Sequence, residues 1–152
     1  MRYLIVCIGN PNGGDDAVGP YIAEKMSSEM KDKTFDGEIL DVGIAPENFT
    51  GVIKEKNPET LILIDAVDMN LSSGVVRIIP PDSIGVMHVS THGIPLSVFI
   101  QYLQQYIKNI TLIGIQPERM HGEMSASVIK SSNQLIRMLF NETIETIPML
   151  QT

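Results

Sequence analysis

The sequence contains very little cysteine, and this scarcity limits its chemistry. Cys7 is the only cysteine among 152 residues. One cysteine excludes an internal disulfide and every zinc site built from several thiolates. A reactive thiolate needs exposure and nearby positive charge. Because Cys7 lies within an apolar run, we predict that it is an inert core residue.

Basic residues are also scarce. The chain has 11 Lys and Arg against 18 Asp and Glu, a formal net charge of −7 and a pI near 4.8. The sequence has no cluster of Lys or Arg that could follow the phosphates of a nucleic acid. We therefore expect no nucleic-acid partner.

Long hydrophobic runs are missing as well. The longest, such as 61–64, fall far short of the roughly 20 residues that span a bilayer. The apolar stretch after Met1-Arg2 is too short for a secretory signal. We therefore expect a soluble, cytoplasmic protein without membrane insertion. With 43% hydrophobic residues, the chain can form a core, and its length predicts one domain over 1–152.

Apolar runs typical of strands alternate with helical patterns along the chain. The predicted strands are 2–8, 38–42, 60–66, 75–79 and 110–115. A first predicted helix begins near Gly19-Pro20, and three further helices are predicted over 45–56, 95–107 and 123–140. The strands are apolar throughout, which is typical of parallel strands buried on both faces. The pattern predicts an α/β fold with a mainly parallel sheet covered by helices on both faces.

Polar residues gather where the predicted strands end, the edge at which open α/β sheets bind ligands. They are Asn10, Asp15, Asp16, Asp41, Gly43, Glu47, Asn48, Asp65, Asp68, His88, Thr91, His92, Gln116, Glu118, Arg119 and His121. Surface loops carry charge in any protein, so a functional and a structural interpretation of this set are equally open.

The first of these loops, residues 9–16, is rich in glycine but lacks the motifs of phosphate-binding loops. Asp15 and Asp16 would repel a phosphate. A helix start keeps carboxylates ionised, and ionised carboxylates suit a metal ion better. The alternative, that Asp16 simply caps the following helix, has equal weight.

Two further residues complete a candidate metal site. Asp65 ends a buried strand, so its charge needs a cation or backbone N–H groups nearby. Asp68, three residues on, is instead typical of a turn. His92 is expected at the same edge, with His88 in an exposed loop and His121 a weaker candidate. Two carboxylates and one imidazole can hold a divalent ion with open positions, without selecting one metal.

Five segments together resemble the nickel–iron hydrogenase maturation endopeptidases, in the branch that processes hydrogenase 3 of formate hydrogenlyase. They are IGNPNGGDDAVGP (8–20), DVGIAPEN (41–48), LILIDAVDM (61–69), STHGIPL (90–96) and LIGIQPE (112–118). Their order matches that family, and the resemblance extends from Met1 to about Phe140.

The resemblance implies a three-layer sandwich with a twisted, mainly parallel five-stranded sheet. It also implies removal of a C-terminal extension from a hydrogenase large-subunit precursor after nickel insertion. The family's metal-binding and catalytic positions carry over onto Asp16, Asp65 and His92. Gly43, Thr91 and Gln116 fall in segments that shape the substrate cleft. The nickel would arrive with the precursor, the expected partner, so no tightly held metal of the protein's own is expected.

Alternatives remain open at this point. Cleavage could use metal-activated water, or Asp16 and Asp65 could share a proton as in aspartic proteases. A metal-dependent phosphohydrolase would use the same two carboxylates as magnesium ligands, although no lysine or arginine lies near the loop to hold phosphate. A non-catalytic assembly domain would use them as caps and turns.

Overall fold

The computed structural model describes residues 1–84, 88–89 and 95–151. The strands are β1 (Tyr3–Ile8), β2 (Gly37–Gly43), β3 (Thr60–Asp68), β4 (Val76–Ile79), β5 (His88–Val89) and β6 (Asn109–Ile115). The α-helices are α1 (Val18–Glu29), α2 (Thr50–Lys56), α3 (Pro81–Ile84), α4 (Leu96–Leu103) and α5 (Ala126–Phe140). Short 3₁₀ helices are η1 (Gly14–Ala17), η2 (Met30–Asp32), η3 (Pro46–Phe49) and η4 (Ile144–Thr146).

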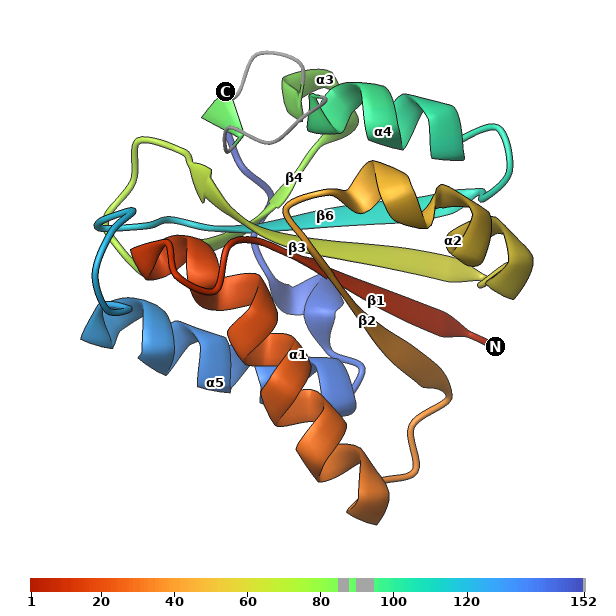
Figure 1. The fold of residues 1–152 in the computed structure, drawn as a ribbon, viewed down its shortest axis with the longest axis horizontal. Coiled ribbons are helices and arrows are strands. Elements are labelled where there is room, and N and C mark those ends of the chain that lie inside the picture. The colour runs from red at the N-terminus through yellow and green to blue at the C-terminus, as the bar shows by residue number, and fades with distance from the viewer. Residues whose placement is uncertain (85–87, 90–94, 152) are drawn as a thin grey trace.

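Five strands form the main sheet in the order β2-β1-β3-β6-β4 (Figure 1). The first four of these are parallel, and β4 runs antiparallel to β6. This arrangement confirms the predicted mainly parallel five-stranded sheet. The short strand β5, which pairs antiparallel with the end of β3, was not predicted. The backbone of His88 therefore belongs to a strand and not to the predicted loop.

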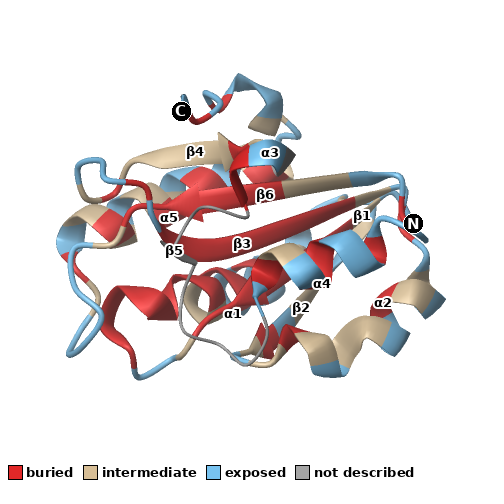
Figure 2. Ribbon diagram, turned by 90° about the horizontal axis from the view of Figure 1, so that it is seen from above, coloured by how far each residue is buried: buried red, intermediate tan, exposed pale blue. Residues whose placement is uncertain are grey.

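Helices cover both faces of the sheet, as the apolar strands predicted. Alternate side chains of β3 point to opposite faces. Leu61 and Leu63 share one hydrophobic cluster with α2 and α4, whereas Ile62 and Ile64 share the other with α1 and α5. Figure 2 shows β3 buried along nearly its whole length. Within the described residues, none of the helices combines the length and the apolar character that crossing a membrane requires.

The helix boundaries differ from the predictions mainly at their ends. Pro20 lies in the first turn of α1, as predicted. The predicted helix 45–56 is divided into η3 and α2. Helix α4 ends at Leu103, although Ile107 is still buried. Helix α5 begins at Ala126 because Ser125 is its N-cap residue and also bonds to a distant carboxylate described below.

The strand order creates a topological switch point between β1 and β3. The chain goes from β1 to β2 on one side and then returns to β3 on the other. Loops that leave neighbouring strands in opposite directions open a crevice at the carboxyl ends of those strands, where α/β proteins bind ligands. Cys7 lies beside Ile64 in the register of these strands, so the loop after Ile8 begins alongside Asp65.

Candidate active site

Asp16 lies at this switch point, on the turn η1 between β1 and α1. Its side chain is only 5% exposed. The backbone N–H of Asn10 donates a hydrogen bond to Asp16 Oδ2 at 2.9 Å, which ties the carboxylate to the loop after β1. The N-cap residues of η1 and α1 are Gly13 and Ala17. Asp16 is therefore not the cap of either helix, and the capping interpretation is wrong.

Asp65 lies in β3, against which η1 packs. The residue is 1% exposed, and its Oδ1 accepts a hydrogen bond from the N–H of Ala66 at 2.9 Å. By strand alternation its side chain lies on the same face as Leu63 and Val67, the face covered by α2 and α4. The fold thus carries two buried carboxylates to the switch point, on η1 and on β3.

Asp68 has the turn role that the sequence predicted. It is exposed, and its Oδ1 accepts hydrogen bonds from the N–H of Asn70 at 3.0 Å and from Gln116 Nε2 at 3.1 Å. The first bond closes an Asx turn directly after β3.

The third predicted metal ligand, His92, lies outside the described residues, as does Thr91. In the parts of the chain that are described, no group of three or more His, Cys, Asp and Glu side chains is placed to hold a metal ion. The three-residue set that includes His92 therefore stays a prediction. His121, the weaker candidate, is exposed in the connection between β6 and α5.

Gly43 lies at an irregularity of the sheet beside the loop that leads to η1. The β1–β2 register shifts after Cys7, so that Ile8 pairs with Gly43. Gly43 has φ of +59°, a left-handed conformation that glycine adopts without strain. Its carbonyl accepts the N–H of Gly9 at 2.8 Å, and among the described residues other than its chain neighbours no atom lies within 4 Å of where a Cβ would be. Its predicted substrate contact stays a prediction.

Gln116, directly after β6, is 6% exposed and uses its amide within the chain. Its Oε1 accepts the N–H groups of Met69 at 2.6 Å and Leu71 at 3.2 Å, and its Nε2 donates to Asp68 and to the carbonyl of Pro117. It also lines a cavity of about 420 Å³ together with Ala66, Asp68, Pro117, Glu118, Arg119 and Met120. Gln116 therefore fixes one wall of a cavity at the carboxyl ends of β3 and β6.

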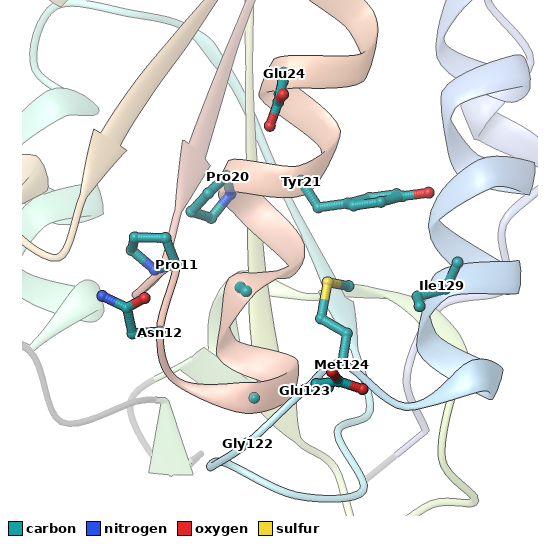
Figure 3. Close-up of a pocket in the computed structure, with 11 residues that line it drawn as sticks. Pro11, Asn12, Pro20, Tyr21, Glu24, Gly122, Glu123, Met124 and Ile129 are labelled. Atoms are coloured by element: carbon teal, nitrogen blue, oxygen red, sulfur yellow. The ribbon is translucent and has the colours of Figure 1, made fainter.

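A second cavity, of about 510 Å³, lies against η1, which contributes Gly14 and Ala17 to its lining (Figure 3). The start of α1 forms one side, with Pro20 and Tyr21, and the connection before α5 forms the other, with Glu123 and Met124. The same connection between β6 and α5 thus contributes residues to both cavities.

Asp15, the neighbour of Asp16, has a different role that the sequence did not distinguish. It is completely buried, and its carboxylate accepts hydrogen bonds from the N–H groups of Glu118, Arg119 and Ser125 and from Ser125 Oγ, at 2.7 to 3.1 Å. Burial raises the pKa of Asp15, but these hydrogen bonds to the ionised form outweigh burial, and the net pKa is lowered. The partners are more than 100 positions away, so no local pattern could identify them.

Cys7 is fully buried in β1, as predicted. Burial raises the pKa of its thiol far above the ordinary value, and the nearby charge of Asp41 raises it further. A thiol in this state is inert as a nucleophile.

A family model described as hydrogenase maturation protease matches residues 20–142. The hydrogenase 3 maturation protease of Escherichia coli K12 is 40% identical over 119 residues, which are 78% of this chain and 74% of that protein. This chain belongs to the hydrogenase maturation proteases. It is therefore a peptidase, and the resemblance predicted from the five segments is confirmed.

Solved structures of hydrogenase maturation proteases have the same fold. The solution structure of the endopeptidase HycI from Escherichia coli has a TM-score of 0.87 and 32% identity, covering 99% of this chain and 97% of that one. The crystal structure of a nickel–iron hydrogenase maturation protease HycI from Thermococcus kodakarensis KOD1 has a TM-score of 0.82 and 31% identity, covering 93% and 92%. The α/β architecture is thus shared with structures from a bacterium and an archaeon.

Proposed function

We propose that this hydrogenase maturation protease removes the C-terminal extension from a nickel–iron hydrogenase large-subunit precursor after nickel insertion. The observation that carries the proposal is the pair of buried carboxylates, Asp16 on η1 and Asp65 on β3, at the switch point of the sheet. Such a pair supplies the acid–base groups that peptide hydrolysis needs. Membership of the family supplies the reaction class. Neither the phosphohydrolase nor the assembly-domain alternative has support from the relatives.

In this proposal nickel belongs to the substrate. Asp16, Asp65 and His92 contact the ion that the precursor already holds, and imidazole is a ligand type suited to nickel. The protein then needs no tightly held metal of its own. Recognition of the ion makes cleavage a checkpoint, because a precursor without nickel lacks the group that these side chains contact.

The peptide around the scissile bond would run from the switch point, where Asp16 and Asp65 lie, into the 420 Å³ cavity at the ends of β3 and β6. Gly43 and Thr91 would contact it directly, while Gln116 would act by holding the cavity wall through its own hydrogen bonds. One carboxylate takes a proton from the attacking water, whose oxygen adds to the carbonyl carbon. The C–N bond then breaks and the proton passes to the leaving amine. We place this reaction in the cytoplasm.

The proposal is tested with purified protein and precursor prepared with and without nickel. We expect cleavage of the nickel-loaded precursor and no cleavage of the nickel-free one, measured as the shift in mass of the large subunit. Equal cleavage of both forms would show that cleavage does not depend on nickel. Hydrolysis of a generic phosphoester without precursor cleavage would favour the phosphohydrolase.

Substitution of the two carboxylates tests their roles. We expect Asp16→Asn and Asp65→Asn to lower precursor cleavage by at least about 100-fold, the usual contribution of a general acid or base. Asp32→Asn is the matched control, because Asp32 is an exposed aspartate of η2 that lines neither cavity. Unchanged folding is checked by circular dichroism. Full activity of either of the first two variants would contradict the assignment of that residue.

A further inference from the structure

Asp15 joins η1 to residues 118–125, which we call the 118–125 segment. Its own N–H donates to the carbonyl of Arg119 at 2.8 Å, and its Oδ2 accepts the N–H of Arg119 at 3.1 Å and of Glu118 at 2.8 Å. Asp15 thus binds the start of the segment both as a donor, through its backbone N–H, and as an acceptor, through its carboxylate. Hydrogen bonds to an ionised acceptor are about twice as strong as neutral ones.

The same carboxylate also binds the end of the segment. The N–H of Ser125 donates to Asp15 Oδ1 at 2.7 Å, and Ser125 Oγ donates to Oδ2 at 2.7 Å. Within the segment, Arg119 Nε donates to the carbonyl of Glu123 at 2.9 Å. The loop is therefore closed on itself and fastened at both ends to one buried side chain.

The approach of η1 to the segment is too close for a side chain at position 14. Gly14 has φ of +63°, and a Cβ there would lie 2.5 Å from the N atom of His121. Glycine is the residue that satisfies both the backbone angle and the contact. The local sequence Gly-Asp-Asp thus combines a close approach at Gly14, a fastening carboxylate at Asp15 and the predicted catalytic carboxylate at Asp16.

The 118–125 segment contributes to the walls of both cavities. Glu118, Arg119 and Met120 line the 420 Å³ cavity, and Gly122, Glu123 and Met124 line the 510 Å³ cavity (Figure 3). A movement of the segment relative to η1 would change the cavity walls, and η1 is also the turn that carries Asp16. A carboxylate that fixes both is in a position to affect substrate binding and the chemical step.

We infer that Asp15 is a positioning residue of the peptidase: it holds the 118–125 segment and the Asp16-bearing turn η1 as one unit. This inference rests on the proposed function, because it assigns Asp16 and the cavities to precursor cleavage. Asp15 itself has all its described contacts within the chain and acts through Asp16 and the cavity walls.

Kinetics of three variants test the inference. Asp15→Asn places an amide N–H₂ among four donors, and we expect precursor cleavage to fall by about 100-fold, the cost of a misplacement near 1 Å. Ser125→Ala removes one donor and keeps the backbone N–H, so we expect a smaller loss in kcat/KM, about fivefold, with a raised KM. The matched control is Ser132→Ala, which removes an equally buried hydrogen bond of 2.7 Å within α5. We expect it to leave kcat and KM unchanged.

Amide hydrogen exchange supplies a readout that does not depend on cleavage. The N–H of Asn10 bonds to Asp16 and makes no bond to Asp15, so its exchange rate reports the position of Asp16. We expect Ser125→Ala and Asp15→Asn to speed exchange at Asn10 as well as at Glu118 and Arg119, and Ser132→Ala to leave all three unchanged.

The outcomes are distinguishable. Faster exchange at Glu118 and Arg119 with no change at Asn10 would overturn the inference, because the fastening would then be local to the segment. Equal kinetic effects of Ser125→Ala and Ser132→Ala would overturn it too. If the wild-type protein leaves the nickel-loaded precursor intact, the proposed function fails, while exchange at Asn10 still decides whether Asp15 holds the turn of Asp16.

Discussion

At the scale of single residues, Asp15 and Asp16 show how neighbouring identical side chains acquire different roles. Both are buried at the start of α1. Asp15 receives four hydrogen bonds from the connection between β6 and α5, whereas Asp16 receives the N–H of Asn10 within its own loop. The first carboxylate is thereby committed to structure. The second faces the switch point, where the proposed chemistry needs a carboxylate.

The lowered pKa of Asp15 predicts a specific loss of stability in acid. The ionised form is favoured in the folded state, so its contribution is fully present above the ordinary carboxyl value of 3.8 and is lost as pH falls from there through the lower folded-state pKa. We expect the free energy of unfolding of the wild type to decrease across this window more steeply than that of Asp15→Asn. Urea unfolding at a series of pH values measures both slopes. Equal slopes would mean that Asp15 is not held ionised by its partners.

At the scale of elements, the sequence was informative where a pattern is local. The apolar runs placed β1 and β3 correctly. The 3.6-residue period identified α4, although the predicted helix 95–107 runs past its end at Leu103. Asp65 lies in the apolar run 60–66, so the sequence places it at the carboxyl end of a strand, the edge where open α/β sheets bind ligands. Alternation of strand and helix also predicted the covered sheet faces.

What the sequence could not show depends on contacts between distant positions. The sequence around Asp15 does not indicate that its carboxylate bonds to Ser125. The sequence around Gln116 does not indicate its hydrogen bond to Met69. The two-residue strand β5 forms because its backbone pairs with β3. A run of two residues is too short for its composition to predict such pairing. From the sequence alone, capping and metal binding are equally open roles for Asp16, because both need a carboxylate at a helix start. The structure excludes the capping role, because Gly13 and Ala17 are the N-cap residues of η1 and α1.

Gln116 stabilises the connection between β3 and β4, and this leads to a prediction about the stability of the fold. Gln116 accepts the N–H groups of Met69 and Leu71, so Gln116→Ala leaves a buried donor unsatisfied. We expect the free energy of unfolding to fall by about 1–3 kcal/mol. Gln101→Ala, at an exposed position of α4, is the control and is expected to stay within about 0.5 kcal/mol of wild type. Denaturant titration measures both. Unchanged stability with a raised KM for precursor would show instead that Gln116 binds the substrate directly.

At the scale of the whole molecule, the two hydrophobic clusters share one sheet. Alternate residues of β1 and β3 enter opposite clusters, so neither face can lose its packing without exposing the other side of the same strands. Cys7 lies in the interior strand β1, fully buried among Ile5, Ile64 and the side chains of α1 and α5. Its thiol therefore reports the integrity of the fold.

This arrangement predicts that alkylation of Cys7 requires global unfolding. The thiol is inaccessible, and its raised pKa keeps it protonated, so the native protein should resist iodoacetamide at neutral pH. We expect the labelling rate to rise with urea along the same curve as loss of the circular-dichroism signal, since core strands open only in the global transition. Fully unfolded protein, labelled at the intrinsic thiol rate, is the control. Labelling well below the unfolding midpoint would instead reveal a local opening of β1, and with it of the loop that leads to Asp16.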